Sequence, residues 1–170
     1  HFGLLFVDLD NFKAVNDTYG HDVGDTVITT AADRLSTALR SGDTVARLGG
    51  DEFAVVLTEA AEARHLEAIG RKVVAALEHR GIAGDADAPV VTASVGMALY
   101  PENGSDVATL LRAADSAMYA AKKRGGGAAV MAGIADAMPA ESQPSPDTDA
   151  AGGRWPNLPP GHPGRAGVPE

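Results

Sequence analysis

The chain has 170 residues, of which 45% are hydrophobic, and this is enough for one domain with a buried core. Its formal net charge of −9 and its pI of about 4.9 argue against the broad basic face that nucleic-acid binding requires. The chain contains no cysteine, which rules out disulfides, thiolate metal sites and cysteine nucleophiles and is compatible with a reducing cytoplasm.

The two ends of the chain differ in character. The chain begins at His1, almost directly in a strand-like run, so we interpret it as a fragment of a longer protein. No apolar run has the length of a membrane span, and no signal-peptide pattern is present. We expect a cytoplasmic domain, with any membrane attachment lying upstream. Residues 132–170 hold eight of the ten prolines and few large apolar side chains, which predicts a disordered tail after a domain at residues 1–131.

The domain reads as alternating strands and helices. The continuous apolar run at residues 3–7 predicts a buried central strand, and strict alternation at residues 91–99 predicts a half-buried one. The other expected elements are helices at 11–17, 22–39, 61–79 and 106–123, a strand hairpin at 44–48 and 53–57, and a short edge strand at 128–131.

The order of these elements predicts the fold class. A hairpin forces antiparallel pairing, so the sheet is not doubly wound and parallel. We predict an α+β fold with a central, mostly antiparallel sheet of about five strands flanked by helices.

Gly49-Gly50 in this hairpin is followed directly by Asp51-Glu52. Gly-Gly is a turn signal because both residues tolerate positive φ. The turn therefore lifts two carboxylates to the edge of the sheet, where they suit a hard cation and its phosphate ligands. The alternative is a plain hairpin whose acids are merely solvated.

Asp8 and Asp10 end the first strand. If that strand lies beside the hairpin, Asp8 and Asp51 converge and can hold Mg²⁺, which prefers a few protein oxygens together with substrate phosphates. A short helix follows, so we assign Asp10 to helix N-capping and Asp8 to the metal.

Asn16 and Asp25 lie in a stretch rich in directional hydrogen-bonding groups. An amide and a carboxylate together can read a guanine edge, since the carboxylate accepts from guanine N1–H and N2–H₂. The alternative is ordinary turn and cap chemistry.

Several motifs occur together in a fixed order. They are Asp8-x-Asp10-x-Phe12-Lys13-x-x-Asn16-Asp17-x-x-Gly20-His21-x-x-Gly24-Asp25, Arg47-x-Gly49-Gly50-Asp51-Glu52-Phe53, Ser94-Val95-Gly96 and Ala114-Asp115-x-Ala117-Met118-Tyr119-x-Ala121-Lys122. Over residues 2 to 131 the chain resembles the GGDEF family of diguanylate cyclases. The resemblance implies a bacterial second-messenger enzyme with a ferredoxin-like core, similar to the palm of nucleotide cyclases and polymerases.

The resemblance also implies a reaction and a metal site. Two GTP molecules, one on each subunit of a homodimer, condense to cyclic di-GMP and two pyrophosphates. The implied ligands of Mg²⁺, or of Mn²⁺, are the carboxylates of Asp8 and Asp51 and the Leu9 carbonyl. Glu52 lies beside the metal and helps to deprotonate the 3′-OH.

The remaining site residues carried over by position contact the substrate. Asn16 and Asp25 look like the guanine readers. Phe12, Lys13 and Lys122 match positions that contact the triphosphate, the first two partly through backbone amides.

The resemblance further implies a product-inhibition site. The family's Arg-x-x-Asp motif matches Arg40 and Asp43, and Arg71 resembles the family's second arginine. Arginine can form bidentate contacts with guanine or phosphate. The alternative is an Arg40 favoured by a helix C-terminus and an Asp43 that belongs to a turn.

Two departures from the family pattern stand out. Gly126 occupies the place of a phosphate-binding arginine, so we expect Arg124 or Lys123 to substitute and an arginine restored at position 126 to improve GTP affinity. The family's leading helix lies upstream of His1, and a sensor domain is expected there.

The alternative function is a silent domain that binds GTP or cyclic di-GMP as a sensor. A dimerisation module without ligand would leave the clustered acids unexplained.

Overall fold

The computed structural model describes residues 1–60, 62–79 and 90–133. Its elements are β1 (Phe2–Asp10), α1 (Phe12–Tyr19), α2 (His21–Ala38), β2 (Thr44–Gly49), β3 (Glu52–Leu57), α3 (Ala63–Leu77), β4 (Thr92–Tyr100), α4 (Val107–Lys123) and β5 (Ala129–Met131). The strands form one sheet in the order β2-β3-β1-β4-β5, in which the β4–β5 pair is parallel and the other pairs are antiparallel. The predicted α+β fold with a mostly antiparallel sheet is confirmed.

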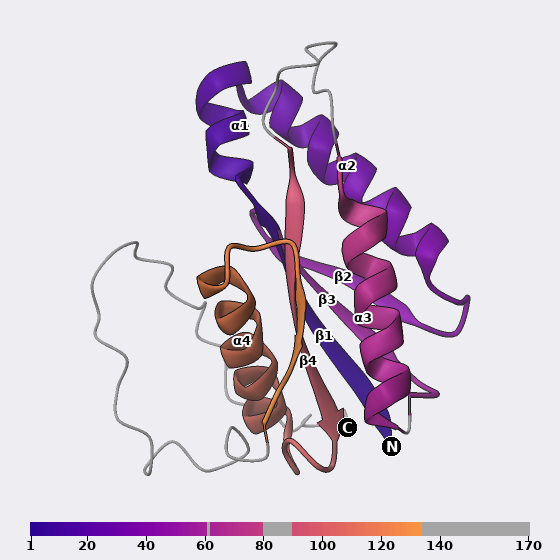
Figure 1. Cartoon of the computed structure of the whole chain (residues 1–170). Helices are drawn as coiled ribbons and strands as arrows, with labels where there is room; N and C mark the ends of the chain where they lie inside the picture. Colours follow the sequence, from indigo (N-terminus) through magenta and orange to yellow (C-terminus); the bar gives the residue numbers. More distant parts are fainter. Residues whose placement is uncertain (61, 80–89, 134–170) are drawn as a thin grey trace, which may run out of the picture.

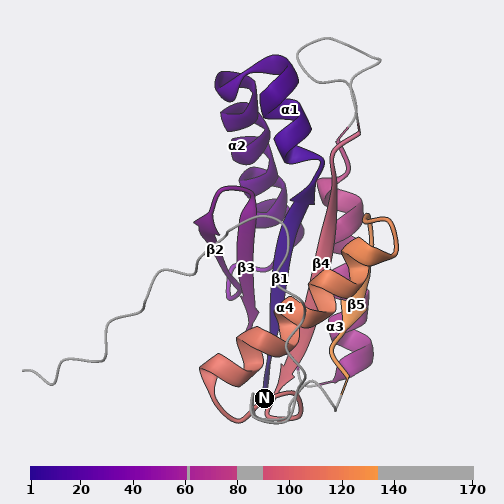
Figure 2. The same ribbon diagram turned by 90° about the vertical axis from the view of Figure 1, so that its left-hand side faces the viewer.

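The sheet separates two layers of helices (Figure 1). One core cluster joins the sheet to α1, α2 and α3, while a second joins its other face to α4. Figure 2 shows α4 crossing the strands on the near face, with α2 and α3 behind them. Helices on both faces explain why the residues of the two middle strands are buried on both sides.

The two middle strands, β1 and β4, are buried on both faces. Leu5, Phe6 and Val7 of β1 are fully buried, which confirms the predicted central strand. The prediction that β4 is half-buried is wrong, because its residues from Ala93 to Leu99 are all buried. The small side chains on one face of β4 let α4 approach closely: a Cβ at Gly96 would collide with Ala114 and Met118.

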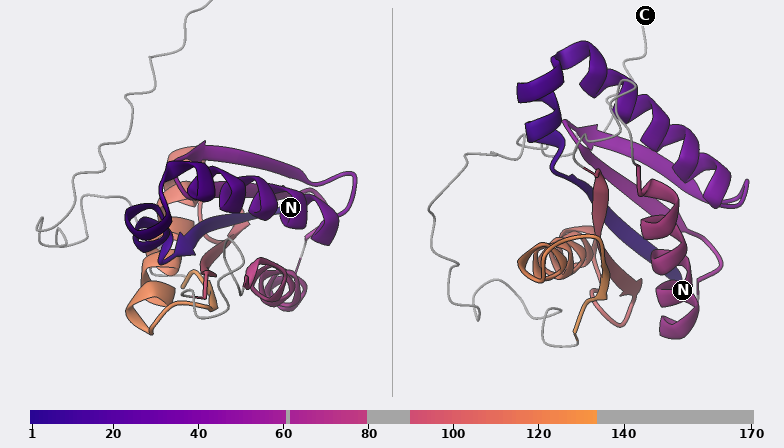
Figure 3. Two further views of the ribbon diagram at one scale, coloured as in Figure 1. Left: turned by 90° about the horizontal axis from the view of Figure 1, so that it is seen from above. Right: turned by 45° about the horizontal axis from the view of Figure 1, so that its top comes forward.

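One end of the sheet gathers several segments that are distant in sequence. β1 ends there at Asp10, β4 begins there at Thr92, and the β2–β3 turn lies beside the end of β1, since Asp8 pairs with Glu52. From this end α1 leaves β1 and turns into α2 (Figure 3, right). We call this end the rim; it is where strands and helix ends bring polar side chains together.

Parts of the sequence predictions lie outside the described residues. They are residue 61, included in the predicted helix 61–79, and residues 134–170 of the predicted tail. Ala132 and Gly133 are described: Ala132 N–H donates to Met97 O at 2.7 Å, and the Asn103 amide donates to the carbonyls of both. Among the described residues, none of the helices combines the length and the apolar character needed to cross a bilayer.

Candidate active site at the rim of the sheet

The strand register brings the predicted acids of β1 and the hairpin together. Asp8 lies directly opposite Glu52 on β3, and the Leu9 N–H donates a hydrogen bond to the Asp51 carbonyl at 3.2 Å. The side chains that follow the Gly-Gly pair are thus fixed beside the end of β1 by backbone pairing. The expected convergence of Asp8 with Asp51 is present in the structure.

A second set of bonds holds the turn that carries Asp51. Gly50 has φ +52°, a left-handed conformation that favours glycine. The Arg47 guanidinium donates to the Gly50 carbonyl from Nε at 3.0 Å and from Nη2 at 2.8 Å. Arg47 had no predicted role, although its place just before the Gly-Gly pair puts it within reach of the turn.

Asp8 is a buried acid in a poorly solvated position. Its residue exposure is 6%, and Lys122 Nζ lies 2.6 Å from its Oδ1 as an ion pair. Oδ1 is itself buried, and the Lys122 ammonium is its partner among the described residues. Burial raises the pKa of Asp8 to about 6; the contact with Lys122 opposes this, and the nearby Asp51 and Glu52 carboxylates add to it.

Glu52 shares this concentration of negative charge. Burial first, then the Asp51 and Asp115 carboxylates, raise the pKa of Glu52, while Lys122 acts in the opposite direction. Burial also raises the pKa of Asp115, a half-buried residue of α4. Asp115 belongs to the motif on α4 but had no predicted role in the site. Its spacing of seven residues from Lys122 places both on one face of α4.

The donor set at the rim fits a hard cation that also binds phosphate. No cluster of three or more His, Asp or Glu side chains with metal-binding geometry occurs in the described part of the chain, so an all-protein cage is absent there. The carboxylates of Asp8 and Asp51 lie close enough to interact, and such a pair matches the few protein ligands that Mg²⁺ takes when phosphates complete its shell.

The predicted guanine readers lie where α1 meets α2. The Asn16 side chain packs against Gly24, and a Cβ at position 24 would collide with the Asn16 side-chain amide. Asp25, the next residue along α2, is exposed. Phe12 packs against the core below α1, while Lys13 is exposed. All four residues lie on α1 or the first half of α2, the helices that follow β1 from the rim.

Asp10 does not cap α1, so that prediction is wrong. The N-cap residue is Asn11, with φ 65° and no side-chain capping bond. The Asp10 carboxylate instead accepts hydrogen bonds from Thr92, Ser94 and the Gly127 amide. These three partners lie far from Asp10 in the sequence, and Asp10 binds them in place of the first backbone N–H groups of α1.

The loop after α4 also changes one expectation. Gly126 has φ +76°, and a Cβ there would lie 2.7 Å from Asp10 Oδ2. An arginine restored at position 126 would thus be strained, and the expected gain in GTP affinity no longer follows. Lys123, an expected substitute, places its Nζ 4.6 Å from the centre of the Tyr119 ring.

Comparison with known proteins accounts for this combination of fold and rim. Residues 1–128 match the model of the family described as "Diguanylate cyclase, GGDEF domain". The chain belongs to the GGDEF domain family.

Two relatives illustrate the likeness of this GGDEF domain. The diguanylate cyclase TpbB of Pseudomonas aeruginosa is 41% identical over 133 residues, which are 78% of this chain and 31% of TpbB. The crystal structure of the TpbB GGDEF domain superposes with a TM-score of 0.72 at 40% identity, covering 78% of this chain and 82% of that one. The crystal structure of the GGDEF domain of DgcB from Caulobacter crescentus, solved in complex with c-di-GMP, superposes with a TM-score of 0.65 at 28% identity. The match covers 76% of this chain and 77% of that one. The chain spans about a third of the length of TpbB.

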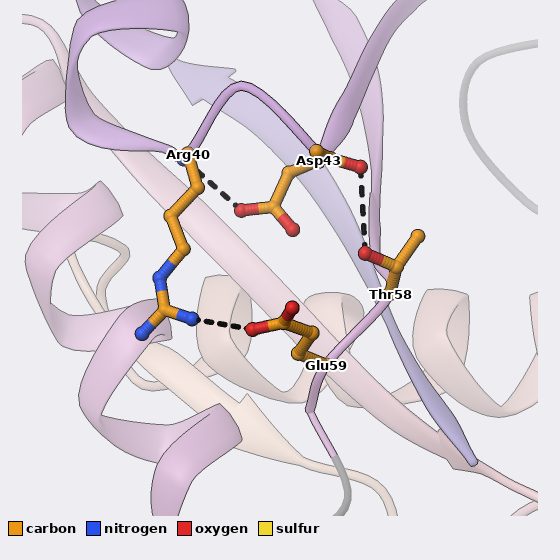
Figure 4. Close-up of polar contacts among 5 residues, drawn as sticks. Arg40, Asp43, Thr58 and Glu59 are labelled. Carbon is orange, nitrogen blue, oxygen red and sulfur yellow. Dashed lines mark hydrogen bonds and ion pairs between the residues drawn. The ribbon is translucent and has the colours of Figure 1, made fainter.

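A second polar cluster of the GGDEF domain surrounds the predicted inhibitory motif (Figure 4). Asp43 Oδ2 accepts a hydrogen bond from the Arg40 backbone N–H at 3.1 Å, while the Arg40 side chain points away to Glu59, with Nη1 2.8 Å from Oε2. Arg71, the predicted second arginine, lies on α3 and pairs with Glu67 at 3.8 Å. Both arginines are therefore held by carboxylates of the same chain.

Proposed function

We propose that this chain is the catalytic domain of a diguanylate cyclase, which condenses two GTP molecules into cyclic di-GMP and two pyrophosphates. The observation that carries the proposal is the buried Asp8 carboxylate, fixed by strand register beside Asp51 and paired with Lys122. The name of TpbB, the relative described above, supports the same activity.

The residues of the rim divide the tasks of the reaction. Asp8, Asp51 and the Leu9 carbonyl would hold the divalent metal, Mg²⁺ or Mn²⁺. When bound, the metal neutralises phosphate charge and makes the ribose 3′-OH more acidic. Glu52, whose pKa burial already raises, accepts the proton of that hydroxyl.

Substrate recognition falls to the neighbouring helices. Asn16 and Asp25 bind the guanine edge, while Phe12, Lys13 and Lys122 contact the triphosphate. The 3′-oxygen then forms a bond to the α-phosphorus of the other GTP, and the bond to the bridging oxygen breaks as pyrophosphate leaves. Such a transfer needs positioning and charge neutralisation more than covalent catalysis.

The site is complete only with a second copy of the chain. One rim binds one GTP, so the attacking hydroxyl must come from a GTP on a partner subunit, and a homodimer is part of the mechanism. A sensor domain upstream would control how the two copies meet. The chain covers 31% of TpbB, which leaves room for such a domain in a comparable full-length protein.

Cyclic di-GMP is also proposed as an inhibitor, bound by Arg40, Asp43 and Arg71. The two arginines would contact its guanine or phosphate groups and Asp43 would accept from its guanine. To do so, Arg40 must leave Glu59, and Arg71 must leave Glu67. The ion pairs are exposed and cost little to break.

The test is to incubate the purified chain with GTP and Mg²⁺ and to measure cyclic di-GMP and pyrophosphate by chromatography. The proposal predicts both products in a ratio of one to two, and their loss when the metal is chelated. GTP binding without products would contradict the proposal and support a silent GTP sensor.

A further inference from the structure

The Asp10 carboxylate joins three segments that are far apart in the chain. Its Oδ2 accepts from the Thr92 hydroxyl at 2.7 Å and from the Gly127 N–H at 2.8 Å, and its Oδ1 accepts from the Ser94 hydroxyl at 2.7 Å. Asp10 lies at the end of β1, its hydroxyl partners lie on β4, and Gly127 follows α4. One half-buried side chain thus ties the loop after α4 to the middle of the sheet.

The same carboxylate lies against residues 125–127, which we call the glycine loop. Its three residues have φ values of +105°, +76° and +61°, all in the left-handed region. A Cβ at Gly126 would lie 2.7 Å from Asp10 Oδ2 and 2.8 Å from Cγ, whereas a Cβ at Gly125 would meet nothing within 4 Å. Glycine at position 126 is therefore the residue that lets the loop close over Asp10.

The amides of the glycine loop are not available to a phosphate. Gly125 N–H donates to the Lys122 carbonyl at 3.0 Å, and Gly126 N–H donates to the Ala121 carbonyl at 3.2 Å. The third amide, that of Gly127, is bonded to Asp10. The loop thus lacks both an arginine side chain and a free amide nest. Next to this loop, Lys122 is a cation that reaches the acids of the rim, through its contact with Asp8.

Lys122 occupies the last turn of α4, directly before the glycine loop. Its carbonyl is bonded to one end of the loop, and its Nζ lies 2.6 Å from Asp8 Oδ1. The other end of the loop is tied to Asp10. We propose that Asp10 is a positioning residue that clamps the glycine loop and thereby places the Lys122 ammonium over the rim for the GTP phosphates. This inference rests on the proposed function of the rim.

The Asp10 carboxylate also constrains position 126, where the family pattern has an arginine. With φ +76° at that position and a Cβ that would lie 2.7 Å from Asp10 Oδ2, this conformation of the loop favours glycine. GTP binding should therefore depend on Asp10 although Asp10 itself contacts no substrate.

The first test concerns the loop alone and needs no GTP. Thermal unfolding is measured for Asp10→Ala, Gly126→Ala and the double variant. Gly126→Ala should lower Tm clearly in the wild-type background and less in the Asp10→Ala background, because the atoms that its Cβ would meet are then gone. Additive losses would overturn the clamp. In parallel, hydrogen exchange of the Gly127 amide should accelerate at least about tenfold in Asp10→Ala.

The second test concerns Lys122. Asp10→Ala should raise KM for GTP about tenfold to a hundredfold, with a much smaller effect on kcat. An effect of this size is typical when a residue that positions a binding side chain, here Lys122, is removed. Asp10→Asn should keep most of the affinity, because its amide oxygen can still accept from Thr92 and Gly127. In a Lys122→Ala background the effect of Asp10→Ala on KM should disappear; an undiminished effect would overturn the positioning role.

Asn103→Ala is the matched control. Asn103 is a buried side chain that binds Leu99 N–H and the Ala132 and Gly133 carbonyls at the other end of β4. Its loss should lower Tm while KM for GTP stays unchanged. A KM raised as much as in Asp10→Ala would mean that a general loss of stability explains both results, and would overturn the proposal.

If the wild-type chain neither binds nor turns over GTP, the proposed function and the role of Lys122 both fail. The stability cycle still decides whether Asp10 shapes the loop.

Discussion

The rim and the Arg40 cluster hold their charged side chains in opposite ways. At the rim, Asp8 is 6% exposed and its place is fixed by pairing with Glu52 on the neighbouring strand. In the Arg40 cluster, the Arg40 and Glu59 side chains are 65% and 76% exposed and meet across an ion pair that solvent can replace. Under the proposed function, the sheet itself fixes the catalytic geometry, whereas a ligand can rearrange the inhibitory cluster at little cost.

The largest effect is expected at Asp8. Asp8→Asn should reduce cyclic di-GMP formation by at least about 10³-fold, because the metal clamp contributes several kcal/mol to the transition state. In metal-free buffer its Tm should not fall, because burial raises the pKa of Asp8 to about 6 in spite of Lys122, which means that folding disfavours the charged carboxylate near pH 7. Turnover and thermal unfolding measure the two effects. Asp33→Asn, an exposed acid of α2, is the control; a variant of Asp8 that keeps wild-type turnover would remove the rim from the mechanism.

A smaller effect is expected at Arg47, an exposed residue whose guanidinium binds the Gly50 carbonyl of the turn. Arg47→Ala should lower kcat about tenfold to a hundredfold, since hydrogen bonds from a charged donor contribute about 1.5–3 kcal/mol. The control is Arg64→Ala, which removes an exposed ion pair with Glu62. Equal kcat values in the two variants would show that the hairpin alone holds Asp51.

The Arg40 cluster should affect inhibition and not turnover. Arg40→Ala is expected to raise the cyclic di-GMP concentration that gives half-inhibition by about tenfold, the effect of losing one well-placed guanine or phosphate contact. The initial rate without product should stay unchanged. Rates measured over a series of added cyclic di-GMP concentrations test this, and an unchanged inhibition curve would refute the inhibitory site.

The smallest effect is expected at Glu59, the residue that holds the Arg40 side chain. Glu59→Gln should make cyclic di-GMP inhibit at a concentration about twofold to fivefold lower, because an exposed ion pair is worth at most about 1 kcal/mol. Glu62→Gln, which frees Arg64 from another exposed ion pair, is the control. Weaker inhibition in Glu59→Gln would mean that Glu59 helps to bind the product.

Local sequence patterns predicted those parts of the molecule that local physics decides. The apolar run of residues 3–7 predicted the central strand and the Gly-Gly turn predicted the hairpin. That the two pair, which the convergence of Asp8 with Asp51 requires, is seen only in the structure. Patterns could not reveal the partners of Asp10, because an acid between a strand and a helix looks the same whether it caps the helix or binds a distant hydroxyl. Nor could they show that β4 is buried on both faces, since its small side chains resemble a solvated face until α4 is packed on them.

The role of Gly126 was only half visible in the sequence. The absence of an arginine at that position could be read from the motif, and its consequence for phosphate binding followed. The reason for the glycine depends on φ +76° and on the Asp10 carboxylate beside it, both of which arise from tertiary structure.

A mixing experiment tests most directly the claim that each chain supplies half of an active site. Wild-type chain and the Asp51→Ala variant are combined at fixed total concentration with GTP and Mg²⁺, and the rate of cyclic di-GMP formation is measured. Because both rims of a dimer must be intact to close the cyclic product, the rate should fall as the square of the wild-type fraction. A rate that falls in simple proportion to that fraction, or a wild-type chain that forms no cyclic di-GMP at any concentration, would contradict the account.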